Sequence, residues 1–135
     1  MDYLAVAVAA AASWLAGAVW YTALARPWMS AIGKTREELM GPGGKPSALP
    51  FVVSFLAELV MAWALAGVIG HLGGGQVTLA NGLISGFFIW LGFVATTLAV
   101  NHRFGGARPM LTVIDGGHWL AVLLVQGAVI GLMGT

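Results

Sequence analysis

The sequence predicts an all-α, polytopic membrane protein: a bundle of four transmembrane helices with a short interfacial helix in the first cytoplasmic loop. Only 8% of the 135 residues are charged and 59% are hydrophobic, and the mean hydropathy is +0.91. A soluble domain carries about 25% charged residues. Long stretches without charge alternate with connections that hold all six lysines and arginines. We therefore expect residues 1–135 to form a single transmembrane domain.

The first crossing is predicted at residues 3–24. No charge occurs between Asp2 and Arg26, and about 20 apolar residues are enough to cross the hydrocarbon core. A cleaved signal peptide is the competing interpretation of this Ala-rich stretch. It requires a positively charged region at its start, where this sequence has Asp2. We therefore expect a retained transmembrane helix.

The first connection, residues 25–48, is the longest segment predicted to lie outside the membrane. Thr35-Arg36-Glu37-Glu38 fits a capping box, in which Thr35 and Glu38 satisfy each other's backbone N–H groups. This pattern predicts a short surface helix ending near Gly41. The glycines and prolines of residues 41–46 predict an irregular segment after it.

Three further crossings follow from the same length argument. Between Lys45 and Arg103 the only charge is Glu58, and this stretch is about twice as long as one crossing at 1.5 Å per residue. The chain is expected to turn back at Gly73-Gly74-Gly75, because glycine destabilises helices and permits tight turns. The predicted boundaries are 49–72, 79–100 and 110–133 for the helices and 101–109 for the second cytoplasmic loop.

The basic residues predict the orientation of the bundle. All of them lie in the two loops that precede the second and fourth crossings: Arg26, Lys34, Arg36, Lys45, Arg103 and Arg108. By the positive-inside rule these loops are cytoplasmic, and both termini lie on the outer side. Trp20, Tyr21 and Trp28 flank Arg26-Pro27 at the inner boundary, where aromatic side chains commonly anchor a helix.

Four polar residues predict an intramembrane cluster: Glu58, Asp115, His118 and Gln126. An ionisable group costs about 2.5–3.5 kcal/mol in the bilayer interior, so each needs a reason to be there. Glu58 and His118 lie equally far from the inner ends of their helices, which predicts that they meet at one depth. Asp115, His118 and Gln126 share one helical stripe. Two interpretations are open. The members of the cluster either satisfy one another's polar groups by hydrogen bonds, or they line a cavity open to the cytoplasm that binds or relays protons or a cation.

A second polar group is predicted at the cytoplasmic boundary: Asn101, His102, Arg103 and Arg108. Long cationic side chains can extend along a helix. We expect Arg103 or Arg108 to reach back to Asp115 and form an ion pair. The alternative is that His102 and the two arginines hold an anionic headgroup or a substrate phosphate.

Glycines in the last crossing predict close helix packing. Gly116, Gly127 and Gly131 fall on one stripe, and residues 127–131 form a small-residue motif. The last helix is therefore expected to be central to the bundle. Such glycine stripes also favour association of copies into a dimer or a higher homo-oligomer.

Several classes of function are not supported. Six scattered basic residues give no surface for nucleic acid. Without cysteine there is no disulfide or thiolate metal site. His71, His102 and His118 lie at different depths and cannot pair as haem ligands, and Glu58, Asp115 and His118 lack the local spacing of a metal site. We therefore predict no metal and no cofactor. No nucleophile motif is present either, so we predict no catalytic residue.

Short segments distributed along the chain carry a family resemblance: Gly17-Ala18-Val19-Trp20-Tyr21, Pro27-Trp28-Met29, Gly33-Lys34-Thr35-Arg36-Glu37-Glu38-Leu39, Trp90-Leu91-Gly92-Phe93, Asn101 and Ile114-Asp115-Gly116-Gly117-His118-Trp119. In their order and spacing they resemble the small bacterial membrane family called domain of unknown function 1761. The resemblance covers nearly the whole chain. It implies four transmembrane helices and a bacterial inner membrane, and it implies no established activity and no catalytic residues.

Three functions agree with these patterns. The first is a homo-oligomeric transporter or channel-like protein for protons, cations or small solutes, because ionisable residues in a bilayer are functional candidates by default. The second is an accessory or assembly subunit of a larger membrane complex. The third is a lipid-binding or lipid-modifying protein. The bilayer itself is the one partner that all three share.

Overall fold

The computed structural model describes residues 1–134, and every regular element within them is helical. Four helical segments are long and apolar enough to cross a membrane. They are α1 (Tyr3–Ala23), α4 (Leu49–Gly70), a third span that runs from α5 (Leu79–Ile89) through the π-helical η2 (Trp90–Ala95) to α6 (Thr96–Phe104), and α7 (Pro109–Met133). The predicted bundle of four transmembrane helices is confirmed.

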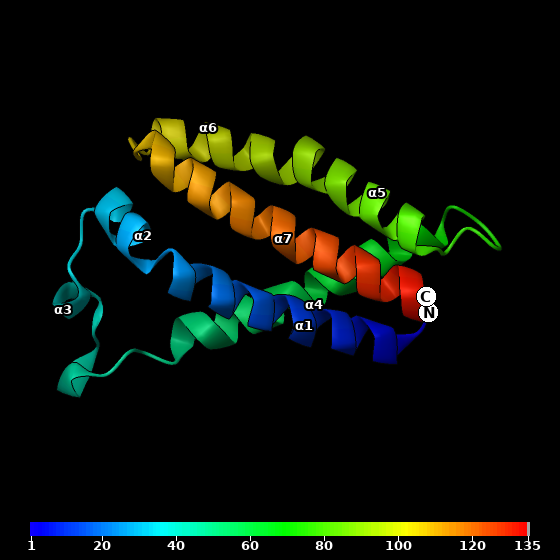
Figure 1. The fold of residues 1–135 in the computed structure, drawn as a ribbon, viewed down its shortest axis with the longest axis horizontal. Helices are drawn as coiled ribbons and strands as arrows, with labels where there is room; N and C mark the ends of the chain where they lie inside the picture. Colours follow the sequence, from blue (N-terminus) through cyan, green and yellow to red (C-terminus); the bar gives the residue numbers. More distant parts are fainter. Residues whose placement is uncertain (135) are drawn as a thin grey trace.

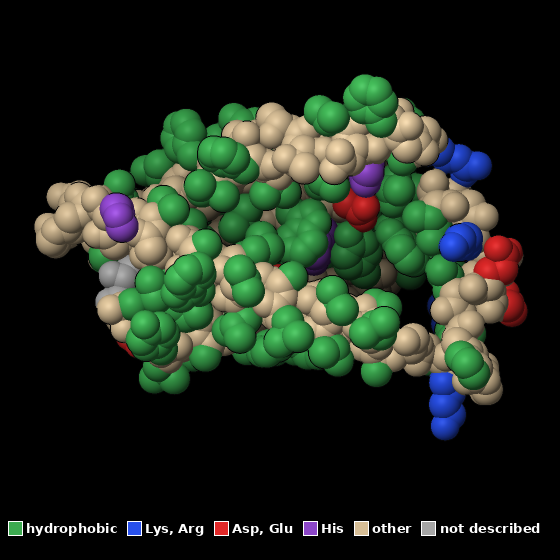
Figure 2. Space-filling model, turned by 180° about the vertical axis from the view of Figure 1, so that it is seen from behind, with side chains coloured by type: hydrophobic (Ala, Val, Ile, Leu, Met, Phe, Trp, Pro, Cys, Tyr) green, Lys and Arg blue, Asp and Glu red, His purple; other side chains and the backbone are tan. Residues whose placement is uncertain are grey.

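The long helices lie side by side, with α7 in contact with each of the others (Figure 1). The most extensive contacts join α7 to α5 and α7 to α1, while α4 packs mainly on α1. Both termini and the turn between α4 and α5 lie at one end of the bundle, and α2 and α3 lie at the other. On the face that Figure 2 shows, lysine and arginine side chains lie at the α3 end, and many hydrophobic side chains cover the surface between the ends.

The turn between the second and third spans is where the glycines predict it. Gly73 and Gly75 have φ angles of 109° and 76°, a region that residues with a Cβ rarely adopt. Helix α4 ends at Gly70, slightly before the predicted boundary. Thr78 then caps α5 by accepting the Asn81 amide at 3.1 Å.

The first connection is more helical than the sequence indicated. The capping box between Thr35 and Glu38 is present and begins α3 (Arg36–Leu39), as expected. In addition, α2 (Ala25–Ile32) follows α1 after a break at Leu24. Pro27 lies in the first turn of α2, where its missing N–H group costs nothing, so the proline is compatible with a helix that begins at Ala25.

The second loop is shorter than predicted. Helix α6 continues to Phe104, so Asn101, His102 and Arg103 lie on a helix and not in a loop over residues 101–109. The chain turns at Gly105 and Gly106 instead, where Gly106 has a φ of 71°. Polar residues at the end of a transmembrane helix can remain helical, because they lie where the headgroups begin.

An apolar core closes the half of the bundle that holds the termini. It is built largely from small residues of α1 and α4, with larger side chains from α7: Val6, Ala9, Ala10, Ala62, Leu65, Ala66, Ile69, Leu123 and Ile130. Small residues let helices approach closely, which is the usual basis of packing in membranes.

Glycines join α5 to α7 where the two backbones approach each other closely. A Cβ atom added at Gly82 or Gly127 would meet the carbonyl oxygen of the other residue, and one at Gly131 would meet the Thr78 carbonyl. Gly127 and Gly131 therefore lie in a tight contact of the predicted kind. Gly116 does not, because an added Cβ there would meet nothing within 4 Å. Its carbonyl instead accepts a hydrogen bond from the Trp90 indole at 2.8 Å.

Candidate functional site

Three buried polar residues from three helices lie together in the interior, and we call them the buried polar triad: Ser13 of α1, Glu58 of α4 and Gln126 of α7. Their exposed fractions are 0%, 1% and 0%. The Gln126 amide nitrogen donates to the Ser13 hydroxyl at 3.1 Å and to the Glu58 backbone carbonyl at 3.0 Å. Gln126 therefore ties α7 to both α1 and α4 near the middle of the bundle.

The triad leaves two buried oxygens without a donor. Within residues 1–134, neither Oε1 of Glu58 nor Oε1 of Gln126 has a hydrogen-bond partner. Buried polar atoms are nearly always satisfied, and an unpaired charge in an apolar interior is very costly. A bound proton on the Glu58 carboxyl, or a small cation beside it, would remove that cost.

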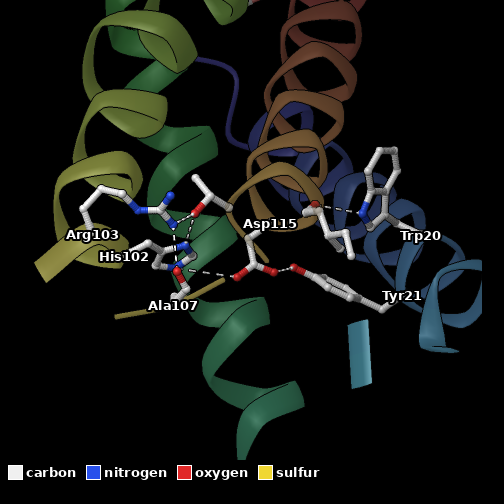
Figure 3. A network of polar contacts seen from close by, with 8 residues as sticks. Trp20, Tyr21, His102, Arg103, Ala107 and Asp115 are labelled. Atoms are coloured by element: carbon white, nitrogen blue, oxygen red, sulfur yellow. Dashed lines mark hydrogen bonds and ion pairs between the residues drawn. The ribbon is translucent and has the colours of Figure 1, made fainter. Parts of the chain in front are cut away.

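A second set of polar contacts lies toward the basic end, and we call it the boundary network (Figure 3). The Tyr21 hydroxyl donates to Oδ1 of Asp115 at 2.7 Å. On the other side of this carboxylate, Nε2 of His102 lies 3.9 Å from Oδ2. His102 in turn contacts the Thr112 hydroxyl through Nδ1 at 2.8 Å. The network links α1, α7 and α6 through the Asp115 carboxylate.

The predicted ion pair between Asp115 and an arginine is absent from the described structure. Arg103 instead donates to the Ala107 carbonyl at 3.0 Å and to the Thr112 hydroxyl at 2.9 Å. Arg108 donates to the backbone carbonyl of Ser30, in α2. Because α6 extends by an extra turn, His102 occupies the position facing Asp115 and the arginines lie beyond it. Asn101 is exposed and makes none of these contacts.

His118 lies between the boundary network and the triad. Only 6% of it is exposed, and its ring centroid is 4.7 Å from that of Tyr21. Gly17 makes room for the imidazole, because a Cβ there would lie 2.7 Å from Nε2. Its Nδ1 atom has no hydrogen-bond partner among the residues that the structure describes. Tyr21 thus contacts both Asp115 and His118.

Glu58 and His118 are not brought together. Glu58 is level with Ser13 and Gln126, whereas His118 is level with Gly17. Eight residues separate His118 from Gln126, which is about 12 Å along α7. The sequence argument assumed that α4 and α7 begin at the same depth. Helix α4 begins deeper in the bundle, since Phe51 in its first turn already accepts a hydrogen bond from Trp14.

Tyr21 is the site residue that sequence reasoning missed. Its place beside Trp20 and Arg26 suggested an anchor at the membrane surface, but its hydroxyl is turned inward to Asp115. A signal was present, because Ser13, Gly17 and Tyr21 are spaced four residues apart and so share one face of α1. All three contact residues of the site.

The ionisable residues do not converge on a metal centre. Within residues 1–134, no three His, Asp or Glu side chains lie close enough together to hold a metal ion. Glu58 belongs to the triad through its backbone carbonyl, while Asp115 and His118 both contact Tyr21. The two groups of polar residues are therefore separate sites.

Substitution of Tyr21 by phenylalanine tests the boundary network. Tyr21→Phe should lower the free energy of unfolding by about 1 kcal/mol, because Asp115 loses a donated hydrogen bond. Tyr3→Phe is the control, since Tyr3 is 70% exposed on the same helix. Thermal melting in mild detergent, followed by circular dichroism, measures the difference. Equal melting curves for the two variants would contradict a stabilising role for the Tyr21 hydroxyl.

The fold is that of a polytopic membrane protein, and it contains two internal polar sites. Its family is known at the level of sequence: residues 4–131 match the family described as "Protein of unknown function (DUF1761)". The chain belongs to this family, in agreement with the resemblance seen in its sequence. Neither a curated protein nor a solved structure matches the chain.

Proposed function

We propose that the protein is a small membrane transport protein whose ion-binding group is the Glu58 carboxyl. The observation that carries this proposal is a carboxyl group that is 1% exposed within a transmembrane helix and has an oxygen with no donor. Intramembrane ionisable residues usually mark ion or substrate paths. A proton or a small cation is the ligand class that such an oxygen accepts.

The arrangement of polar residues supports access from the basic end of the bundle. His102, Asp115, Tyr21 and His118 lie between that end and the triad, whereas the opposite half is closed by the apolar core. The positive-inside rule makes the basic end cytoplasmic and both termini external. In this orientation Glu58 exchanges its ion with the cytoplasmic side, and opening toward the outer side requires rearrangement of the apolar core.

Association of copies is part of the proposal. Of the apolar stretch of the third span, only 6% is buried within the part of the chain that the structure describes. Aromatic side chains such as Phe88 and Phe93 are 64% and 69% exposed on this span. A homodimer or higher oligomer in a bacterial inner membrane would cover part of this surface.

Ion flux in liposomes tests the role of Glu58. Glu58→Gln keeps the shape of the side chain and removes its ionisable oxygen, so we expect it to abolish proton or cation flux measured with entrapped indicator dyes. Glu37→Gln is the matched control, because Glu37 is an exposed acid in α3 and should leave flux unchanged. Wild-type flux in a folded Glu58→Gln variant would refute the proposal.

A second function, that of an accessory subunit, is favoured by the same exposed third span. In that case a different protein covers the aromatic side chains of α5 and η2. The intact mass of the complex after gentle extraction from its native membrane separates the two functions. Copies of this chain alone support transport by a homo-oligomer, whereas a stoichiometric second protein supports the accessory role.

A further inference from the structure

A groove of about 400 Å³ lies between the third span and α7. Its walls include Trp90 and Leu98 from the third span and Leu120 from α7, and Gly116 and Gly117 also line it. Its volume lies in the range of small-molecule sites, which run from about 300 to 1,000 Å³ and are mostly apolar. The groove is separate from the buried polar triad.

The walls of the groove are held in place by a specific contact. The Trp90 indole donates to the Gly116 carbonyl at 2.8 Å and so fixes the ring where the π-helical stretch begins. Gly116 has no side chain, and a Cβ there would meet nothing within 4 Å. The free space is therefore due to the glycine and is not filled by a neighbouring helix.

One end of the groove is cationic. Thr112 lines the groove, and its hydroxyl binds both Nη2 of Arg103 and Nδ1 of His102, at 2.9 and 2.8 Å. Arginine has five N–H donors, and both bonds that Arg103 makes within the protein use Nη2. Since Arg103 is exposed, its other donors can bind a ligand.

We propose that this groove binds an anionic phospholipid, with an acyl chain between Trp90 and Leu120 and the phosphate at Arg103. Charge complementarity favours this occupant, because lysine and arginine side chains gather at this end of the molecule (Figure 2). Asp115, the nearby acid, is already paired with Tyr21 and His102. An apolar groove that ends at an arginine matches the two parts of a phospholipid. The proposal is independent of ion transport.

Native mass spectrometry of the delipidated full-length protein tests this inference. Phosphatidylglycerol and phosphatidylcholine with identical acyl chains are titrated separately. We expect phosphatidylglycerol to bind about fivefold more tightly, since one basic residue near an anionic headgroup contributes on that scale. Arg103→Gln should remove this preference, whereas Arg36→Gln, which changes an exposed arginine in α3, should retain it.

A second pair of variants tests the apolar part. Gly116→Leu places a side chain in the groove and should weaken binding of both lipids by fivefold or more. Gly92→Leu is its control, because Gly92 also faces open space but does not line the groove. Equal binding of the two lipids to the wild type, or wild-type binding by a folded Gly116→Leu variant, would overturn the proposal.

Discussion

Replacement of Gly127 by leucine is expected to separate the third span from the rest of the bundle. A Cβ at this position would meet the backbone carbonyl of Gly82, so the two helices have to move apart. Overpacking of a core typically costs 1–3 kcal/mol, and here the obstacle is backbone on both sides. We expect a loss of at least about 3 kcal/mol and a strongly lowered melting temperature in detergent.

The matched control for this substitution is again Gly92→Leu. Gly92 lies in the third span, but a Cβ there meets nothing within 4 Å. The Gly92→Leu variant should therefore melt at nearly the wild-type temperature. If Gly127→Leu melts like Gly92→Leu, then α5 and α7 do not pack through their glycines. Gly82→Leu should reproduce the effect of Gly127→Leu from the opposite helix, because the two glycines face each other.

The number and extent of the spans could be predicted because they depend on averages over many residues. The lengths of the stretches without charged residues predicted the four crossings, and the glycines at residues 73–75 predicted the turn between the second and third of them. Helix ends depend on single residues and were less accurate. Pro27 lies in the first turn of α2 in the structure, and α6 continues through Asn101, His102 and Arg103. Local sequence alone does not distinguish a polar helix end from a loop.

The partners within the site could be predicted only in part. The stripe of Asp115, His118 and Gln126 on α7 follows from helical periodicity, and each of these residues does contact other helices. Which residue they meet depends on how far each helix is shifted along its axis. That shift places Glu58 beside Gln126 instead of His118, and no spacing within one helix reveals it.

Replacement by leucine should change the melting temperature in opposite directions at Glu58 and at Asp115, the two acids within the spans. Oε1 of Glu58 has no donor, and an unsatisfied buried polar atom costs about 1–3 kcal/mol. Glu58→Leu should therefore raise the melting temperature while it abolishes ion flux. Replacing a buried charged group by an apolar one of similar size is often neutral or stabilising.

Asp115→Leu is the matched contrast. The Asp115 carboxylate accepts the Tyr21 hydroxyl and faces Nε2 of His102, so its loss leaves that hydroxyl and that ring nitrogen without their partner and should lower the melting temperature. Replacement of a residue that serves only stability lowers the free energy of unfolding, whereas replacement of a residue that serves function can raise it. If Glu58→Leu melts well below the wild type, then Glu58 is a structural member of the triad and the assignment of ion binding to its carboxyl is wrong.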